Sequence, residues 1–172
     1  MTQLFHSQTS RIVSTLVLFL FILNPLFGPV ASQHGKQSLP LPDTSLQPGD
    51  VVKIVIDSLA NNDHPYPDAG IEATFNFASP ANRVNTGPLD RFVAMVKGPV
   101  YGAMVNHKSS ELSEVILRGN QAYQFVRLIT SDDMEVYFVF RLGLQIDGEY
   151  KDMWMTEAVS PVKKPEDDGL KI

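Results

Sequence analysis

The C-terminal half of the chain alternates short runs of strand-forming residues with turn signals, and this pattern constrains the fold more than any other feature of the sequence. The runs are rich in valine, tyrosine and phenylalanine, and they are separated by Arg118–Gln121, by Ser131–Asp133 and by Asp147-Gly148, which is a strong β-hairpin signal. The pattern predicts four antiparallel strands, over residues 115–117, 122–130, 135–144 and 150–159. One face of such a sheet has to be filled with apolar side chains.

The half that precedes these strands predicts helices joined by proline-bearing turns. Behind Asp50, a suitable helix cap, apolar residues from Val51 to Leu59 follow a helical spacing, although the β-branched run VVKIVI also fits a strand. Residues 68–78 fit a helix face and an alternating strand equally well. Residues 90–97 are a clearer short helix, because Gly-Pro pairs precede and follow them. Helices followed by an antiparallel meander predict an α+β domain.

The N-terminal segment predicts export. Residues 12–23 form an apolar run, IVSTLVLFLFIL, with Arg11 before it and prolines and a glycine after it. The run is about as long as the hydrophobic region of a signal peptide, and residues 30–32 are small enough to suit cleavage. A retained anchor is the alternative, because further apolar residues follow the run. We therefore expect a periplasmic or secreted protein, with a thylakoid lumen as a third location, either free or anchored to the membrane.

Composition sets the remaining limits. The chain contains no cysteine, so its core must hold the fold without disulfides, and thiolate catalysis and cysteine-based zinc sites are excluded. A net charge of -5 without a basic stripe argues against a nucleic-acid partner. We expect a signal peptide or N-terminal anchor at 1–32, a polar linker at 33–49, a single α+β domain at 50–160 and a disordered tail at 161–172.

Three blocks of the sequence, NNDHPYPDAGIEATFNFASPANRVNTGPLDRF, VYGAMVNH and WMTEAV, resemble an uncharacterised bacterial and plastid family, domain of unknown function 4864. The resemblance extends from about Val51 to Val159 and carries no assigned activity. It favours a helix over 51–62 and a helix or helical turn over 71–78. The order of elements is also similar to the NTF2-like (cystatin-like) fold, which implies helices packed on a curved four-stranded antiparallel sheet around a conical cavity. Such folds serve as enzymes, ligand carriers and assembly modules, so the resemblance selects no function.

The candidate catalytic residues are His64, Asp68 and His107. Asp63, His64 and Asp68 could place an imidazole beside a carboxylate, the pairing used in general acid/base catalysis. Helix capping is the alternative, with Asn62 or Asp63 closing the first helix and Asp68 capping the second. The sequence lacks a phosphate-binding glycine loop, a GxSxG elbow and an HExxH motif, and the two domain histidines are too far apart for a local metal motif. We therefore expect no metal and no cofactor.

The candidate ligand-binding residues are Tyr66, Arg83, His107 and Trp154. Arg83 and His107 could face the mouth of a cavity and bind an anionic group, because arginine offers a planar fork of donors. Alternatively, Arg83 clamps backbone carbonyls or a local carboxylate such as Asp90. Tyr66 and Trp154 could line a pocket, and core filling is the alternative for the aromatic residues.

These features together predict an exported, non-catalytic NTF2-like module that binds a small molecule or a protein partner. The first alternative is a small hydrolase or isomerase that uses a histidine and a carboxylate in a pocket. The second is an assembly factor for a membrane complex. A homodimer formed through the sheet face is a further arrangement to test, and membrane contact is expected only through an uncleaved N-terminal segment.

Overall fold

A computed structural model describes residues 38–164, in which helices precede strands along the chain. The helices are α1 (Pro48–Ala60), α2 (Ala69–Asn76), α3 (Pro80–Thr86), α4 (Leu89–Val96) and a short 3-10 turn (Gly102–Met104). The strands are β1 (Ser109–Leu112), β2 (Ile116–Arg118), β3 (Gln121–Ile129), β4 (Glu135–Leu144) and β5 (Trp154–Val162). This order confirms the predicted α+β class.

The predicted signal peptide or anchor at 1–32 and residues 165–172 of the predicted tail lie outside the described residues. Among residues 38–164, no helix has both the length and the hydropathy needed to cross a membrane.

The sheet is antiparallel and contains five strands in the described part of the chain, so the prediction of four strands was wrong. The missed strand is β1, whose sequence SSEL is largely exposed and carries no apolar pattern. β1 and β2 pair with the same edge of β3, at Leu112↔Val126 and Ile116↔Tyr123 respectively. Five strands thus occupy four positions across the sheet, in the order β1/β2-β3-β4-β5.

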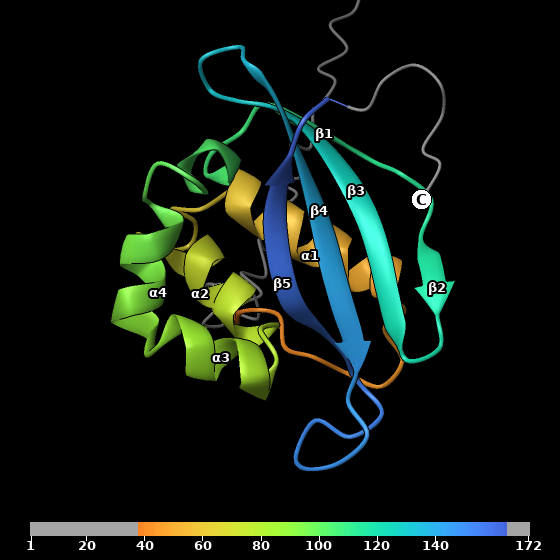
Figure 1. Cartoon of the computed structure of the whole chain (residues 1–172). Coiled ribbons are helices and arrows are strands. Elements are labelled where there is room, and N and C mark those ends of the chain that lie inside the picture. The colour runs from red at the N-terminus through yellow and green to blue at the C-terminus, as the bar shows by residue number, and fades with distance from the viewer. Residues whose placement is uncertain (1–37, 165–172) are drawn as a thin grey trace, which may run out of the picture. The chain divides into compact units, whose positions relative to one another are not determined.

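Helix α1 lies against one face of the sheet and forms the centre of the core (Figure 1). Pro48 occupies its first turn, and Asp50 accepts a hydrogen bond from the Gln47 backbone N–H at 2.9 Å. Its β-branched residues fit a helix because they all fall on the buried stripe: Val51, Val52, Val55, Ile56 and Leu59. The helix prediction for this segment is confirmed and the strand alternative is wrong. Burial of each such side chain contributes roughly 1.5–3 kcal/mol.

Helix α2 packs closely on α1 through Gly70, which has no side chain to hold the two backbones apart. A Cβ placed on Gly70 would lie 2.1 Å from the carbonyl oxygen of Ser58 in α1. Helix α4, predicted over 90–97, buries Phe92 and Val96. In Figure 1, α2, α3 and α4 gather on the β5 side of α1.

The segment between α2 and α3 attaches to the free edge of β5 at a single residue. Thr156 donates its backbone N–H to the Phe77 carbonyl at 2.8 Å, and its carbonyl accepts from the Ser79 N–H at 2.9 Å. Ser79 then caps α3 by accepting a hydrogen bond from the Asn82 N–H at 3.1 Å. Helix α3 was not predicted, because it buries none of its residues and so shows no apolar periodicity. The Ser79-Pro80 pair is a signal that could have found it.

Part of the segment predicted as a linker lies against the domain. Asn76 donates a hydrogen bond to the Pro40 carbonyl at 3.3 Å, and Leu46 packs against the core.

Candidate functional site

A pocket of about 290 Å³ opens between the helices and strands β4 and β5. We call it the helix–sheet pocket. Its apolar walls come from α1, α4 and the helix-facing side of the sheet: Val55, Leu59, Phe92, Val96, Phe140 and Val159. Most of these residues also belong to the hydrophobic core, so the pocket is a continuation of the core toward solvent. Its volume lies at the lower end of the range found for small-molecule sites.

Most hydroxyl groups on the pocket wall are already used within the protein. Thr74 donates to the Gly70 carbonyl at 2.9 Å, one turn back in α2. Thr86 donates in the same way to the Asn82 carbonyl at 3.0 Å. The Tyr101 hydroxyl donates to the backbone carbonyl of Val159 at 3.1 Å. These donors therefore tie the walls together and are not free for a ligand.

Thr156 differs from the other two threonines on the wall. The residue is 5% exposed, and its Oγ1 has no hydrogen-bond partner within residues 38–164. A buried hydroxyl without a partner is costly, so its position requires an explanation.

Thr156 lies at an irregularity of the β4–β5 pairing. Thr156 pairs with Leu142 and Ala158 pairs with Arg141, which leaves Glu157 as an extra residue on β5. This is a β-bulge, a feature that bends a strand and redirects its side chains. Thr156 and Val159 consequently stand opposite Leu142 and Phe140, on the side of the sheet that faces α1.

Arg83 lies beside a separate, smaller hollow rather than in the helix–sheet pocket. Its guanidinium lies between two aromatic rings, 5.1 Å from the centroid of Phe75 and 5.2 Å from that of Tyr150. It donates to the Asn76 carbonyl at 2.8 Å and to the Tyr150 hydroxyl at 3.0 Å. Its Nε is buried and has no partner in the described residues. Arg83 thus clamps a backbone carbonyl, as the alternative interpretation expected, and its partner is Tyr150 rather than Asp90.

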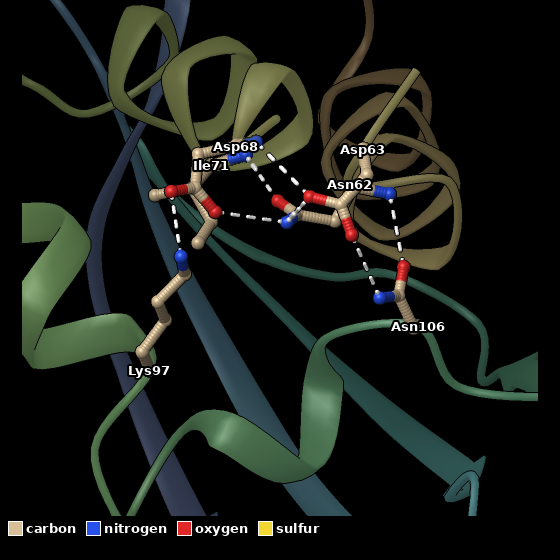
Figure 2. A network of polar contacts seen from close by, with 6 residues as sticks. All are labelled: Asn62, Asp63, Asp68, Ile71, Lys97 and Asn106. Atoms are coloured by element: carbon tan, nitrogen blue, oxygen red, sulfur yellow. Dashed lines mark hydrogen bonds and ion pairs between the residues drawn. The ribbon is translucent and has the colours of Figure 1, made fainter. Parts of the chain in front are cut away.

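The loop after α1 begins with a polar network centred on Asn62, which is 1% exposed (Figure 2). Its Oδ1 accepts from the Ile71 N–H at 3.1 Å, and its carbonyl accepts from the Gly70 N–H at 2.8 Å. Its backbone N–H donates to the Asn106 Oδ1 at 3.2 Å. Asn62 therefore caps α2 from the end of α1 and joins both to the turn before β1.

The carboxylates of Asp63 and Asp68 belong to this network. Asn62 Nδ2 donates to Asp63 Oδ1 at 2.8 Å and to Asp68 Oδ1 at 3.1 Å, and Lys97 Nζ lies 2.6 Å from Asp68 Oδ2. The Asp68 N–H and the Asn106 side chain lower the pKa of Asp63, and Lys97 followed by Asn62 lowers the pKa of Asp68. Asp68 stands at the N-cap position of α2, but its side chain makes no cap hydrogen bond, so that part of the capping prediction was wrong.

His64 and Tyr66 lie on the exposed part of the same loop. His64 borders a shallow groove with Asn61 and Pro65, and none of the hydrogen bonds found within residues 38–164 joins its ring to Asp63 or Asp68. Tyr66 is 41% exposed and donates its hydroxyl to Glu72 at 2.8 Å. Neither residue lines the helix–sheet pocket.

His107 is buried and Trp154 is partly buried against the core, and neither lines the helix–sheet pocket. His107 is 6% exposed, and its Nδ1 lies 2.8 Å from the Met104 carbonyl, with which it shares a hydrogen bond. Trp154 begins β5 and packs against the core. The four predicted ligand-binding residues therefore do not converge on one cavity, and none of them lines the helix–sheet pocket.

Residues 38–164 thus form an α+β domain with an apolar pocket between its helices and its sheet. A family model described as a domain of unknown function (DUF4864) matches residues 50–168, and the chain belongs to this family. Comparisons with curated proteins and with solved structures gave no match.

Proposed function

We propose that this domain is a binding module of NTF2-like design whose helix–sheet pocket holds a small, mainly apolar molecule. The observation that carries the proposal is the pocket itself. It has about 290 Å³ of space, walls made of core side chains and hydroxyl donors that are mostly tied to backbone carbonyls. An apolar ligand entering such a site removes its own surface and that of the walls from water.

The arrangement of the elements supports the NTF2-like part of the proposal. The helices cover one face of the sheet, and strands β3, β4 and β5 arch over α1 (Figure 1). The pocket lies between that face and the helices, with walls from α1, α4 and β5. A cavity enclosed by a bent sheet and a long helix is the arrangement that the NTF2-like resemblance implies.

Binding is favoured over catalysis because the candidate acid/base residues lie away from the pocket. Neither His64 nor His107 lines it, and the carboxylates of Asp63 and Asp68 are engaged by Asn62, Asn106 and Lys97. We further propose that binding takes place after export, on the basis of the apolar N-terminal run and its cleavage-compatible flank.

A pocket-filling substitution tests the proposal. Val159→Trp enlarges a wall residue next to Phe140, whereas Val139→Trp makes the same change on the opposite face of the sheet, because Val139 alternates with Phe138 and Phe140 along β4. We expect a panel of small aromatic and aliphatic compounds to raise the melting temperature of the wild type and of Val139→Trp, but not of Val159→Trp. A panel that shifts none of the three proteins, or all three equally, contradicts the proposal.

A further inference from the structure

We propose that Tyr101 is the end wall of the helix–sheet pocket and that its ring sets the length of the ligand that the pocket accepts. This inference rests on the proposed function. It adds to that function the residue that selects the ligand by size, and it makes the ligand a short apolar molecule rather than a long chain.

A second apolar hollow, of about 450 Å³, follows the helix–sheet pocket along the sheet. We call it the end hollow. Its apolar lining comes from the turn after α4, from the beginning of β4 and from the end of β5: Pro99, Val100, Ala103, Met134, Val136, Phe138, Pro161 and Val162. Val100 and Met134 are exposed large hydrophobic residues, so the end hollow is open to solvent.

On both strands the lining changes from the helix–sheet pocket to the end hollow within two residues. Along β4, Phe140 lines the pocket and Phe138 lines the end hollow. Along β5, Val159 lines the pocket and Pro161 lines the end hollow. Val159 pairs with Phe140 and Pro161 pairs with Phe138, on the side of the sheet that faces α1. The two cavities are therefore consecutive along one face of the sheet.

Tyr101 lies at the boundary between the two cavities. It lines the helix–sheet pocket, whereas Val100 and Ala103, on either side of it in the chain, line the end hollow. Tyr101 packs against the core, and its hydroxyl donates to the Val159 carbonyl at 3.1 Å. Among the hydrogen bonds found within residues 38–164, this is the one that joins residues 97–104 to β5. The Tyr101 side chain therefore reaches from the turn after α4 to β5, at the place where the pocket gives way to the end hollow.

The volume of the pocket sets the length that this wall allows. A water molecule occupies about 30 Å³ of liquid, so a pocket of about 290 Å³ accepts on the order of ten non-hydrogen atoms. Each methylene group that enters an apolar site raises the affinity about fourfold. A longer chain has to displace the Tyr101 ring or leave its end in water, so the gain in affinity should stop at about that length. Without the ring, the chain can continue past Phe138 and Pro161 into the end hollow.

The straight-chain alcohols from 1-hexanol to 1-tetradecanol measure this limit, because they differ only in the number of methylene groups. Each alcohol is titrated by calorimetry, below its solubility limit, into the purified protein in the form that the expressing cells yield. We expect the affinity of the wild type to rise about fourfold with each methylene group up to a chain of about nine carbons. Beyond that length, each further methylene group should change the affinity by less than about twofold, because it stays in water.

Four variants separate the ring from the hydrogen bond. Tyr101→Ala removes the wall and should bind 1-dodecanol at least about tenfold more tightly than the wild type does. Tyr101→Leu shortens the wall with less loss of packing and should also extend the limit, which keeps the test available if the alanine variant does not fold. Tyr101→Phe keeps the ring and should keep the limit. Tyr123→Ala is the matched control, because the Tyr123 hydroxyl is also bonded, to Gln121 at 2.8 Å, and Tyr123 lines neither cavity.

The same limit in the wild type, Tyr101→Leu and Tyr101→Ala would overturn the inference while the pocket remained a binding site. An extension in Tyr101→Phe or Tyr123→Ala as large as that in Tyr101→Ala would overturn it too, because the ring of Tyr101 would then not be the wall. A wild type whose affinity rises without a limit up to 1-tetradecanol would have the same meaning. If the wild type binds none of the alcohols, the proposed function fails as well.

Discussion

Asn62 Oδ1 accepts the backbone N–H of Ile71 at 3.1 Å, so the residue after the last turn of α1 caps the first turn of α2. The intervening loop contains the cis His64-Pro65 peptide, and Asp68 has a positive φ of 65°. An ordinary N-cap lies directly before its helix and uses its own side chain. Here the cap comes from the preceding helix, which fixes the two helices relative to each other as well as satisfying the N–H.

Replacement of Asn62 by alanine should therefore destabilise the domain by about 2–4 kcal/mol, because the buried Ile71 N–H loses its acceptor and the two carboxylates lose a shared donor. Asn61→Ala is the matched control, since Asn61 is exposed and its side chain, within residues 38–164, bonds to the Asp57 carbonyl one turn back. Urea denaturation measures both. If the two variants agree within about 0.5 kcal/mol, the cap has no special role.

Acid should weaken the same junction. The pKa values of Asp63 and Asp68 lie below their ordinary value of 3.8, through the Asp68 N–H and Asn106 for Asp63 and through Lys97 and Asn62 for Asp68. The folded state therefore binds protons less readily than the unfolded chain, so this contribution is complete above about pH 4 and is lost as the pH falls through the folded pKa values.

The free energy of unfolding, measured in urea between pH 3 and 7, should fall less steeply with acid in Asp63→Asn than in the wild type. Asp132→Asn removes the same charge from an exposed turn and corrects for the change in net charge. An identical pH profile for the wild type and Asp63→Asn would contradict the assignment.

The contact of Gly70 with α1 gives a stability prediction of a different kind. Gly70→Ala should cost about 3 kcal/mol or more, because the new Cβ would lie 2.1 Å from the Ser58 carbonyl and 2.8 Å from the Asn62 Cα, and both are backbone atoms that cannot move alone. Gly49→Ala, in the first turn of α1, meets only the Val115 side chain at 3.4 Å, and should be neutral or stabilising by up to about 1 kcal/mol. Similar melting temperatures for the two variants would show that α2 can move away from α1 at little cost.

Arg83 should not be replaceable by lysine. Its planar guanidinium stacks between Phe75 and Tyr150 while it donates to the Asn76 carbonyl, and an ammonium group cannot do both. We expect Arg83→Lys to lose about 1–2 kcal/mol of stability. Arg118→Lys, on the exposed strand β2, should change the melting temperature little. Equal effects of the two substitutions would mean that charge alone accounts for the contribution of Arg83.

The sequence was sufficient for elements whose signals are local. The turn signals placed β2, β3 and β4, and the apolar stripe together with the family resemblance placed α1. The last strand was predicted over 150–159 but extends from Trp154 to Val162, because residues 150–153 belong to the turn before it. Strand β1 was missed because an exposed edge strand needs no apolar alternation, and α3 was missed because it buries nothing. The apolar residues of α1 indicate that one side of this segment is buried. A strand has a buried side as well, so the family resemblance was needed to favour the helix over residues 51–62.

The site was less predictable because it depends on pairing between distant segments. Polar residues between prolines drew attention to His64 and Tyr66, yet those side chains lie on the exposed part of the loop. Thr156 lies beside a register shift against Arg141 and Leu142, and no residue pattern near Thr156 predicts such a shift. Only the sheet pairing reveals that this threonine faces the pocket.

The unpaired state of Thr156 has a consequence for stability that does not depend on any ligand. Thr156 and Ser79 are both buried residues, 5% and 0% exposed, but Ser79 caps α3 through Asn82 whereas Thr156 Oγ1 has no partner in the described residues. Ser79→Ala should therefore cost about 1–2 kcal/mol, the usual effect of a lost helix cap. Thr156→Val replaces an unsatisfied hydroxyl with a methyl group of the same size, so the ligand-free protein should keep its stability or gain about 1 kcal/mol. Unfolding in urea compares the two directly. A loss for Thr156→Val as large as that for Ser79→Ala would show that the Thr156 hydroxyl is bonded in solution.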